Sequence, residues 1–250
     1  MRNALTAIFL FGLSLAGLAL FNADPELLPP DKTVYIETRL KESDEVIEIA
    51  LNRTSKRTFD EKDYIINQAD SDNHRTITYY VLSGETIKTH SFFSQNSAEG
   101  KTVNSSTIEF DWNNLLAYVE WQDFVKSEKK TKTVKLTKNT IIVDELRIFA
   151  QNLLRQKQKE STARLLLPNG ETINMKVKVQ EEIKEVKVNN QPIKYFRVTM
   201  KPDLGLISLI IPEVDYWFAA EPPYNFVRYS GLQSGPGSPD VIIEAVPVKN

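Results

Sequence analysis

The chain contains no cysteine and only two histidines among its 250 residues. Without cysteine it cannot form disulfide bonds, bind zinc through thiolates, use a thiol nucleophile or carry a lipid on a cysteine. The histidines, His74 and His90, lie in no HisGluXaaXaaHis pattern and have no second ligand nearby, so we predict no metal site and no cofactor. Stability must come from a hydrophobic core, for which the supply of Val, Ile, Leu, Phe and Tyr is adequate.

An excess of charge of one sign is also missing. The chain has 31 basic and 33 acidic residues, a net charge of −2. The first 23 residues hold one arginine and no acid, so the remainder has 30 basic and 33 acidic residues, a net charge of −3. This balance gives the chain as a whole no electrostatic reason to bind nucleic acid or anionic lipid.

No catalytic motif is present either. The sequence lacks a glycine-rich phosphate loop and a GlyXaaSerXaaGly elbow, so it predicts neither nucleotide binding nor serine-hydrolase activity. We assign no catalytic residue. A hydrolase acting on envelope glycan or peptide would need only two carboxylates at a suitable separation. The sequence cannot pair the available candidates, which are Glu109, Asp111, Glu120, Asp123, Asp215 and Glu221.

The one long apolar run lies at the N-terminus. Positive charge at Arg2 precedes 18 residues, Ala4–Phe21, that are almost all apolar, as in a secretory leader. We predict a signal peptide over residues 1–23, cleaved after Ala19 or Ala23. A retained anchor facing the periplasm is the alternative, with membrane contact only through residues 4–21. Either way we expect an exported protein, with the periplasm as its location.

Residues 24–32 carry three prolines and predict an extended linker. From residue 33 to 250 the dominant hydrophobic period is two, as in Thr172–Gln180, where apolar and polar side chains alternate. Turn residues separate about a dozen such runs, at Ser83-Gly84, Asp111–Asn114, Asn169-Gly170 and Asn189-Asn190. The pattern predicts a mainly β fold: one domain, a highly curved antiparallel sheet or incomplete β-barrel.

One segment has helical periodicity. Residues 144–158 place Leu146, Phe149 and Leu153 on one face, and Asp144 can cap the N-terminus. We expect this amphipathic helix to fill the concave side of the sheet or to lie across its edge. The concave side itself is expected to be apolar. The lysine-rich run 129–138 is expected to protect an exposed sheet edge from aggregation.

Aromatic residues gather near the C-terminus, with six between residues 216 and 229. They could line a groove for an apolar or sugar ligand, oriented by an arginine, or they could simply complete the core. Two earlier tryptophans are open to the same two interpretations. The candidate ligand-binding residues are Trp112, Trp121, Trp217, Phe218, Tyr224 and Arg228.

The same C-terminal stretch carries a family resemblance. TrpPhe, ProPro, PheValArgTyr and GlyProGlySerPro follow one another between residues 217 and 239, after TyrTyrValLeuSerGly at 79–84 and GluPheAspTrpAsnAsnLeu at 109–115. This order resembles bacterial domain-of-unknown-function family 3108 over residues 76–246; residues 33–75 lie outside the likeness. The resemblance implies an exported envelope protein of antiparallel β architecture with no transferable activity. By analogy of shape, the resemblance implies a fold similar to the half-open barrel of periplasmic lipoprotein carriers.

These observations leave three functions open. We favour a non-catalytic envelope module that binds an apolar ligand or a partner protein. The alternatives are the carboxylate-dependent hydrolase and a purely structural or assembly protein.

Overall fold

The computed structural model describes residues 24–84, 86–180, 184–188, 191–203, 213–233 and 238–246. The predicted signal peptide, residues 1–23, and the predicted Asn189-Asn190 turn lie outside the described residues. Within these ranges, no helix combines the length and hydrophobicity needed to span a membrane.

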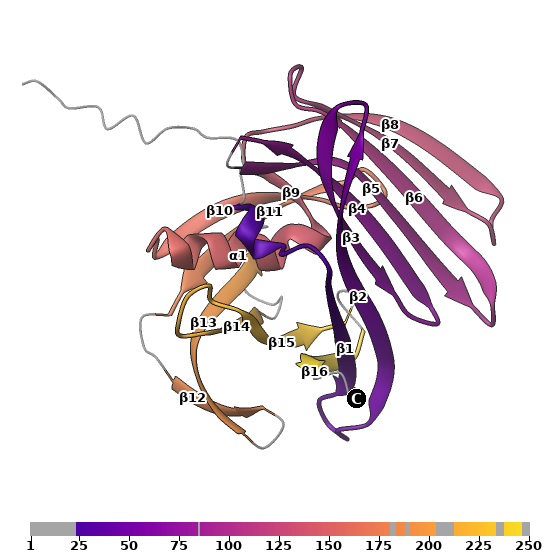
Figure 1. Cartoon of the computed structure of the whole chain (residues 1–250). Coiled ribbons are helices and arrows are strands. Elements are labelled where there is room, and N and C mark those ends of the chain that lie inside the picture. Colours follow the sequence, from indigo (N-terminus) through magenta and orange to yellow (C-terminus); the bar gives the residue numbers. More distant parts are fainter. Residues whose placement is uncertain are drawn as a thin grey trace, which may run out of the picture.

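The described strands form one sheet that is strongly curved and open (Figure 1). Its order is β8-β7-β6-β5-β4-β3-β2-β1-β16-β15-β14-β13-β11-β10-β9, with β12 beside β13. Neighbours are antiparallel except β9 and β10, which are parallel. The predicted curved antiparallel sheet is therefore confirmed. The strands are β1 Lys32–Leu40, β2 Val46–Phe59, β3 Lys62–Asp70, β4 His74–Ser83, β5 Thr86–Ala98, β6 Lys101–Asp111, β7 Leu116–Asp123, β8 Glu128–Lys135, β9 Thr140–Ile142, β10 Glu160–Leu166, β11 Thr172–Val179, β12 Lys184–Val188, β13 Gln191–Pro202, β14 Val214–Ala219, β15 Phe226–Leu232 and β16 Asp240–Val246.

Residues 33–75, which the sequence could not place, join the two halves of the sheet. They form β1, β2 and β3, and β1 pairs with β2 on one side and β16 on the other. Glu37 lies opposite Glu244, so strands from opposite ends of the chain meet in the middle of the sheet. No local pattern could reveal this pairing, because it joins segments about 200 residues apart in sequence.

Three turns lie at the positions that the sequence predicts. Ser83-Gly84 joins β4 to β5 and Asn169-Gly170 joins β10 to β11, with Gly84 at φ +63° and Gly170 at φ +77°. At the third turn, between β6 and β7, the carboxylate of Asp111 accepts hydrogen bonds from the backbone N–H groups of Asn113 and Asn114, at 3.1 and 3.0 Å.

Gly170→Ala should lower the free energy of unfolding by about 1 kcal/mol, because a Cβ is disfavoured at positive φ. A Cβ at this position would also lie 3.1 Å from Cδ of Lys132, whereas one at Gly84 would meet nothing within 4 Å. Urea unfolding of both glycine-to-alanine variants checks this. Gly170→Ala should lower the free energy of unfolding more than Gly84→Ala does. Equal losses would show that the contact with Lys132 of β8 does not affect stability.

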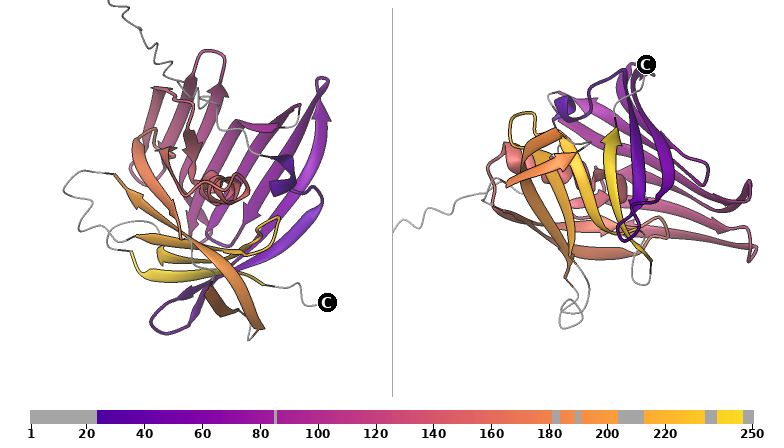
Figure 2. Two further views of the ribbon diagram at one scale, coloured as in Figure 1. Left: turned by 90° about the vertical axis from the view of Figure 1, so that its left-hand side faces the viewer. Right: turned by 90° about the horizontal axis from the view of Figure 1, so that it is seen from below.

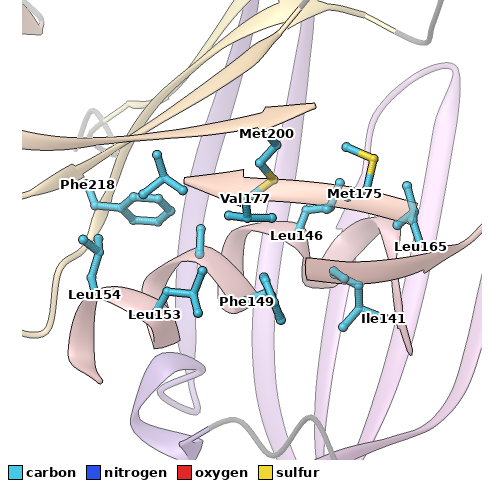
Figure 3. Close-up of a cluster of buried hydrophobic side chains, with 13 residues drawn as sticks. Ile141, Leu146, Phe149, Leu153, Leu154, Leu165, Met175, Val177, Met200 and Phe218 are labelled. Carbon is cyan, nitrogen blue, oxygen red and sulfur yellow. The ribbon is translucent and has the colours of Figure 1, made fainter. Parts of the chain in front are cut away.

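The predicted helix is confirmed and fills the concave side. A 3-10 turn, η2 (Val143–Glu145), leads into α1 (Leu146–Arg155), which lies inside the curve of the sheet (Figure 2). Its apolar side packs against β10, β11, β13 and β14, where Val177, Met200 and Phe218 are fully buried (Figure 3). The capping prediction was wrong: Asp144 does not cap the helix, and Glu145 instead accepts a hydrogen bond from the backbone N–H of Ile142 at 2.9 Å.

A second apolar cluster shows how far the sheet rolls. The end formed by β9 and β10 packs through Ile142 and Leu166 against Ile108, Val119 and other side chains on the inner face of β5–β8. Strand β8 is at the other end of the sheet order, so the lysine-rich strand is an edge strand, as predicted.

Residues 24–32 are not the extended linker that their prolines suggested. A 3-10 turn, η1 (Pro25–Leu27), follows Asp24, and Leu27 and Leu28 are buried in a third cluster with Ile65, Tyr80, Ile87 and Ile148. Arg155 at the end of α1 forms ion pairs with Asp24 and Glu26, at 2.5 and 3.1 Å. Prolines fix φ but do not prevent burial of the leucines between them, so this segment belongs to the folded body.

Candidate functional site

The inner face of β1–β4 is partly polar, contrary to the expectation of an apolar concave side. Ile65 and Tyr80 belong to the third apolar cluster, but other inward positions carry threonine and asparagine. Thr54, Asn67 and Thr78 lie opposite one another on β2, β3 and β4, and all three are buried. The concave side therefore has an apolar part under β10–β14, filled by α1, and a second part under β1–β4, where polar side chains lie beside the third apolar cluster and which we call the polar part.

The helix contributes one charged and one neutral polar side chain to this polar part. Arg147 and Gln151, one turn apart on α1, line a cavity together with Asn52 and Thr54 of β2. Among the described residues, no hydrogen bond or ion pair holds the guanidinium of Arg147; it interacts only at longer range with Asp144, Tyr80 and Tyr216. Burial lowers the pKa of Arg147 from its usual value, but the group stays charged at neutral pH.

A second donor beside Arg147 also lacks a partner. The side chain of Tyr80 on β4 is only 1% exposed, and its hydroxyl has no hydrogen-bond partner among the described residues. Burial is the main reason that the pKa of Tyr80 is raised well above its usual range, so the hydroxyl keeps its proton. Buried polar groups are almost always hydrogen-bonded, so a buried orphan donor next to an unpaired guanidinium is unusual.

Two carboxyl groups close this region toward the start of the helix. Glu145 is 3% exposed and accepts hydrogen bonds from the Thr89 hydroxyl and the Ile142 backbone, while burial raises its pKa to about 7. Asp144 accepts from Thr78 Oγ1 at 3.3 Å, and burial raises its pKa as well. Raised pKa values weaken the negative charge around Arg147 and leave its positive charge dominant at mildly acidic pH.

The cavity beside Arg147 measures about 70 Å³, roughly the space of two water molecules. Besides the helix and β2 residues, it is lined by Val34 and Ile36 of β1, by Asn225 and Phe226, and by the η1 segment from Glu26 to Pro29. The N-terminal segment therefore borders the cavity.

Three of the predicted ligand-binding residues lie on β14 and β15 but on opposite faces. Phe218 points toward α1 and is completely buried in the core. Trp217 points to the convex face, where the Arg228 guanidinium lies 5.9 Å from its ring centroid. Arg228 also forms an ion pair with the buried Glu244 at 2.5 Å.

The other three predicted residues are dispersed. Trp112 stacks on Phe110 and donates from Nε1 to the backbone oxygen of Thr89 at 2.6 Å. Trp121 has the Lys130 ammonium 5.2 Å from its ring centroid. Tyr224 packs against the core cluster beside α1. The structure brings Trp217 and Arg228 together, but it does not form one aromatic groove from the six.

The acidic residues considered for a hydrolase are also separated. Asp215 is held by Arg197 through two hydrogen bonds, at 2.9 and 2.7 Å, and exposed Glu120 pairs with Lys129 at 2.9 Å. Glu109 and Glu120 border a shallow, open depression on the outer face of β6–β8. Within the described residues, none of the five candidates for the hydrolase pair, Glu109, Asp111, Glu120, Asp215 and Glu221, shares an enclosed cleft with another.

Sequence reasoning missed Arg147, Gln151 and Tyr80. A polar stripe opposite the apolar side of a helix usually faces solvent, and threonine in a strand usually faces outward. A usable signal was present, since Asn52 and Thr54, Asn67, and Thr76 and Thr78 recur at inward positions of three successive strands. That signal becomes interpretable only once the concave side is known.

Comparison with known proteins gives no family. No family model matches the chain. No curated protein matches it either. Among solved structures, the hypothetical lipoprotein YmcC from Escherichia coli (K12) aligns over 88% of this chain and 89% of its own, at 5% sequence identity and a TM-score of 0.30.

Proposed function

We propose that this protein is a non-catalytic, exported binding module that holds an acidic group of a small ligand at Arg147, in the polar part of its concave side. The observation that carries the proposal is the unpaired guanidinium of Arg147 beside a cavity. A half-buried charge without a partner is costly, so a protein that retains one usually uses it.

The chemistry of the lining favours an anion. The guanidinium can donate two parallel hydrogen bonds to a carboxylate or phosphate, and the orphan hydroxyl of Tyr80 is a further donor nearby. Amide and hydroxyl groups of Asn52, Thr54 and Gln151 can satisfy the remaining polar atoms. A cavity of about 70 Å³ accepts a head group, while the rest of the ligand would extend past η1.

Fewer observations support the alternative that the module binds an apolar ligand. The apolar parts of the concave side are occupied by α1 and by the β9–β10 end of the sheet, which leaves buried clusters of protein side chains there. Export rests on the predicted signal peptide, and the resemblance to family 3108 remains a prediction in keeping with it.

A thermal-shift experiment on the full chain tests the proposal. Sodium phosphate and sodium acetate, compared with chloride at constant ionic strength, should raise the Tm of the wild-type protein, because a ligand that binds only the folded state stabilises it. Arg147→Met should abolish the rise. Arg57→Met, which removes an exposed arginine from β2, should leave it intact. Equal shifts in both variants, or no shift in the wild type, would refute the site.

Arg147→Met should also unfold at a urea concentration no lower than the wild type, with a gain of up to about 1 kcal/mol. Methionine keeps the packing of the stem and removes a charge that has no partner. Loss of anion-dependent stabilisation together with unchanged or higher stability is the signature of a group retained for binding. Marked destabilisation would instead assign Arg147 a structural role.

A further inference from the structure

Strand β8 leaves one edge of the sheet without a neighbouring strand among the described residues. It is the last strand of the sheet order and forms the border of the sheet (Figure 1). The opposite end of the order, β9, has only three residues, Thr140–Ile142, and all three are buried inside the fold. The edge of β8, Glu128–Lys135, is long enough and open enough to pair with a further strand.

The register with β7 identifies the free backbone groups of β8. The backbone N–H of Leu136 donates to the backbone oxygen of Leu115 at 2.7 Å, and the register of β7 with β8 continues from this pair. In an antiparallel pair, every second residue turns its N–H and C=O toward the neighbouring strand, and the residues between turn theirs away. Four exposed residues of β8 therefore point their backbone donors and acceptors away from β7: Lys129, Thr131, Thr133 and Lys135.

Positive charge remains along this edge after the ion pairs are counted. Lys129 and Lys130 each pair with a neighbouring glutamate, at 2.9 and 3.0 Å. The other lysines of this region are exposed and form no ion pair or hydrogen bond with any described residue: Lys132, Lys135 and Lys138. Residues 128–138 contain five lysines and one glutamate, and Glu120 of β7 offsets one more lysine, so a net charge of +3 remains.

This charge determines which strand can pair with the edge. Two copies of the chain would not pair through β8, because the lysines of one strand would face those of the other, and like charges opposite one another are destabilising. The same repulsion is the basis of the expected protection from aggregation. An acidic strand meets no such repulsion, so the lysines select the charge of the strand that can bind.

We propose that the free edge of β8 binds an extended, acidic segment of a partner protein. The segment pairs with the outward backbone groups of β8, and its carboxylates lie beside Lys132, Lys135 and Lys138. Backbone hydrogen bonds supply the affinity of such strand addition, and complementary charge supplies its specificity.

Fluorescence anisotropy of labelled peptides, titrated with the full-length protein, tests the proposal. The probe is a peptide of alternating glutamate and threonine, eight residues long like β8, with an uncharged fluorophore. It should bind, and the same peptide with glutamine in place of glutamate should bind about tenfold more weakly. The glutamate peptide with every backbone nitrogen methylated should not bind, because it keeps the charge but cannot donate hydrogen bonds to β8.

Variants of the protein locate the contact. Thr133→Pro removes an outward N–H without removing a bond to β7, so it should abolish binding while circular dichroism shows that the sheet is retained. Replacing both Lys132 and Lys135 by glutamine should weaken binding several-fold. The matched control replaces Lys41 and Lys62, two exposed lysines outside β8, by glutamine and should leave binding unchanged.

Absence of binding to the wild type would overturn the proposal and leave the lysines only a protective role. Equal binding of the methylated peptide would also overturn it, since contact would then depend on charge alone, and so would equal binding of the glutamine peptide or normal binding by Thr133→Pro. Arg147→Met should not alter peptide binding, because no residue of β8 lines the Arg147 cavity. The outcome is therefore independent of the proposed anion site.

Discussion

Phe218→Ala is expected to lower the free energy of unfolding by about 3–5 kcal/mol, the usual cost of removing a fully buried aromatic ring. The Phe218 ring is completely buried between α1 and β14, with Phe226 at 6.3 Å and Tyr216 at 6.4 Å between ring centroids. The substitution would leave a void between the helix and the sheet that these rigid neighbours cannot fill. Urea unfolding, followed by circular dichroism, gives the change directly.

The adjacent Trp217→Ala is the control, because it removes a larger aromatic side chain from the convex face. There the ring contacts mainly Tyr195 and Arg228, so its loss should cost clearly less than the loss of Phe218. If Trp217→Ala were the more damaging variant, the assignment of inner and outer faces to β14 would be wrong. If Phe218→Ala were nearly neutral, α1 would not be anchored by this cluster.

Glu145→Gln is expected to remove a pH dependence worth about 3 kcal/mol. Burial raises the pKa of Glu145 from 4.5 to about 7, so the folded state holds its proton over a range in which the unfolded chain has lost it. The favourable contribution is complete below pH 4.5 and is lost as the pH rises to about 7. Glutamine stays neutral throughout; its amide oxygen can accept from the Ile142 N–H, and its NH2 group can donate to the Thr89 hydroxyl.

The measurement is the free energy of unfolding of both proteins between pH 4.5 and pH 8. The wild type should lose stability relative to Glu145→Gln across the lower part of this range and then run parallel to it. Glu42→Gln, in an exposed turn, should track the wild type at every pH. A constant difference between wild type and Glu145→Gln would show that Glu145 ionises normally in the folded protein.

Sequence periodicity correctly predicted the strand and helix patterns that lie within a single segment. Alternation in Thr172–Gln180 identified β11 and its inward Met175 and Val177, and the period of residues 144–158 identified α1. Glycine at positive φ located the hairpin turns. These features follow from chain geometry within a few residues, which is why they could be predicted without knowledge of the fold.

The candidate site could not be predicted in the same way. The Arg147 cavity combines residues of η1, β1, β2 and α1 with Asn225 and Phe226 near the C-terminus. No pattern within any one of these segments indicates that the others lie beside it. The aromatic candidates show the opposite error. Trp217 and Phe218 are adjacent in sequence, but adjacent residues of a strand point to opposite faces, so these two side chains do not line one groove.

The sequence by itself determined the β class, the helix, most turns and the lysine-rich edge, because each depends on composition or on spacing within one segment. Only the tertiary structure decided what the concave side contains. The curvature of the sheet places α1 against β10–β14 and leaves Arg147 beside the polar side chains of β2, and the pairing of β1 with β16 holds the two halves together. Whether a polar side chain meets water or another strand depends on contacts between distant segments, and such contacts leave no local periodic signature.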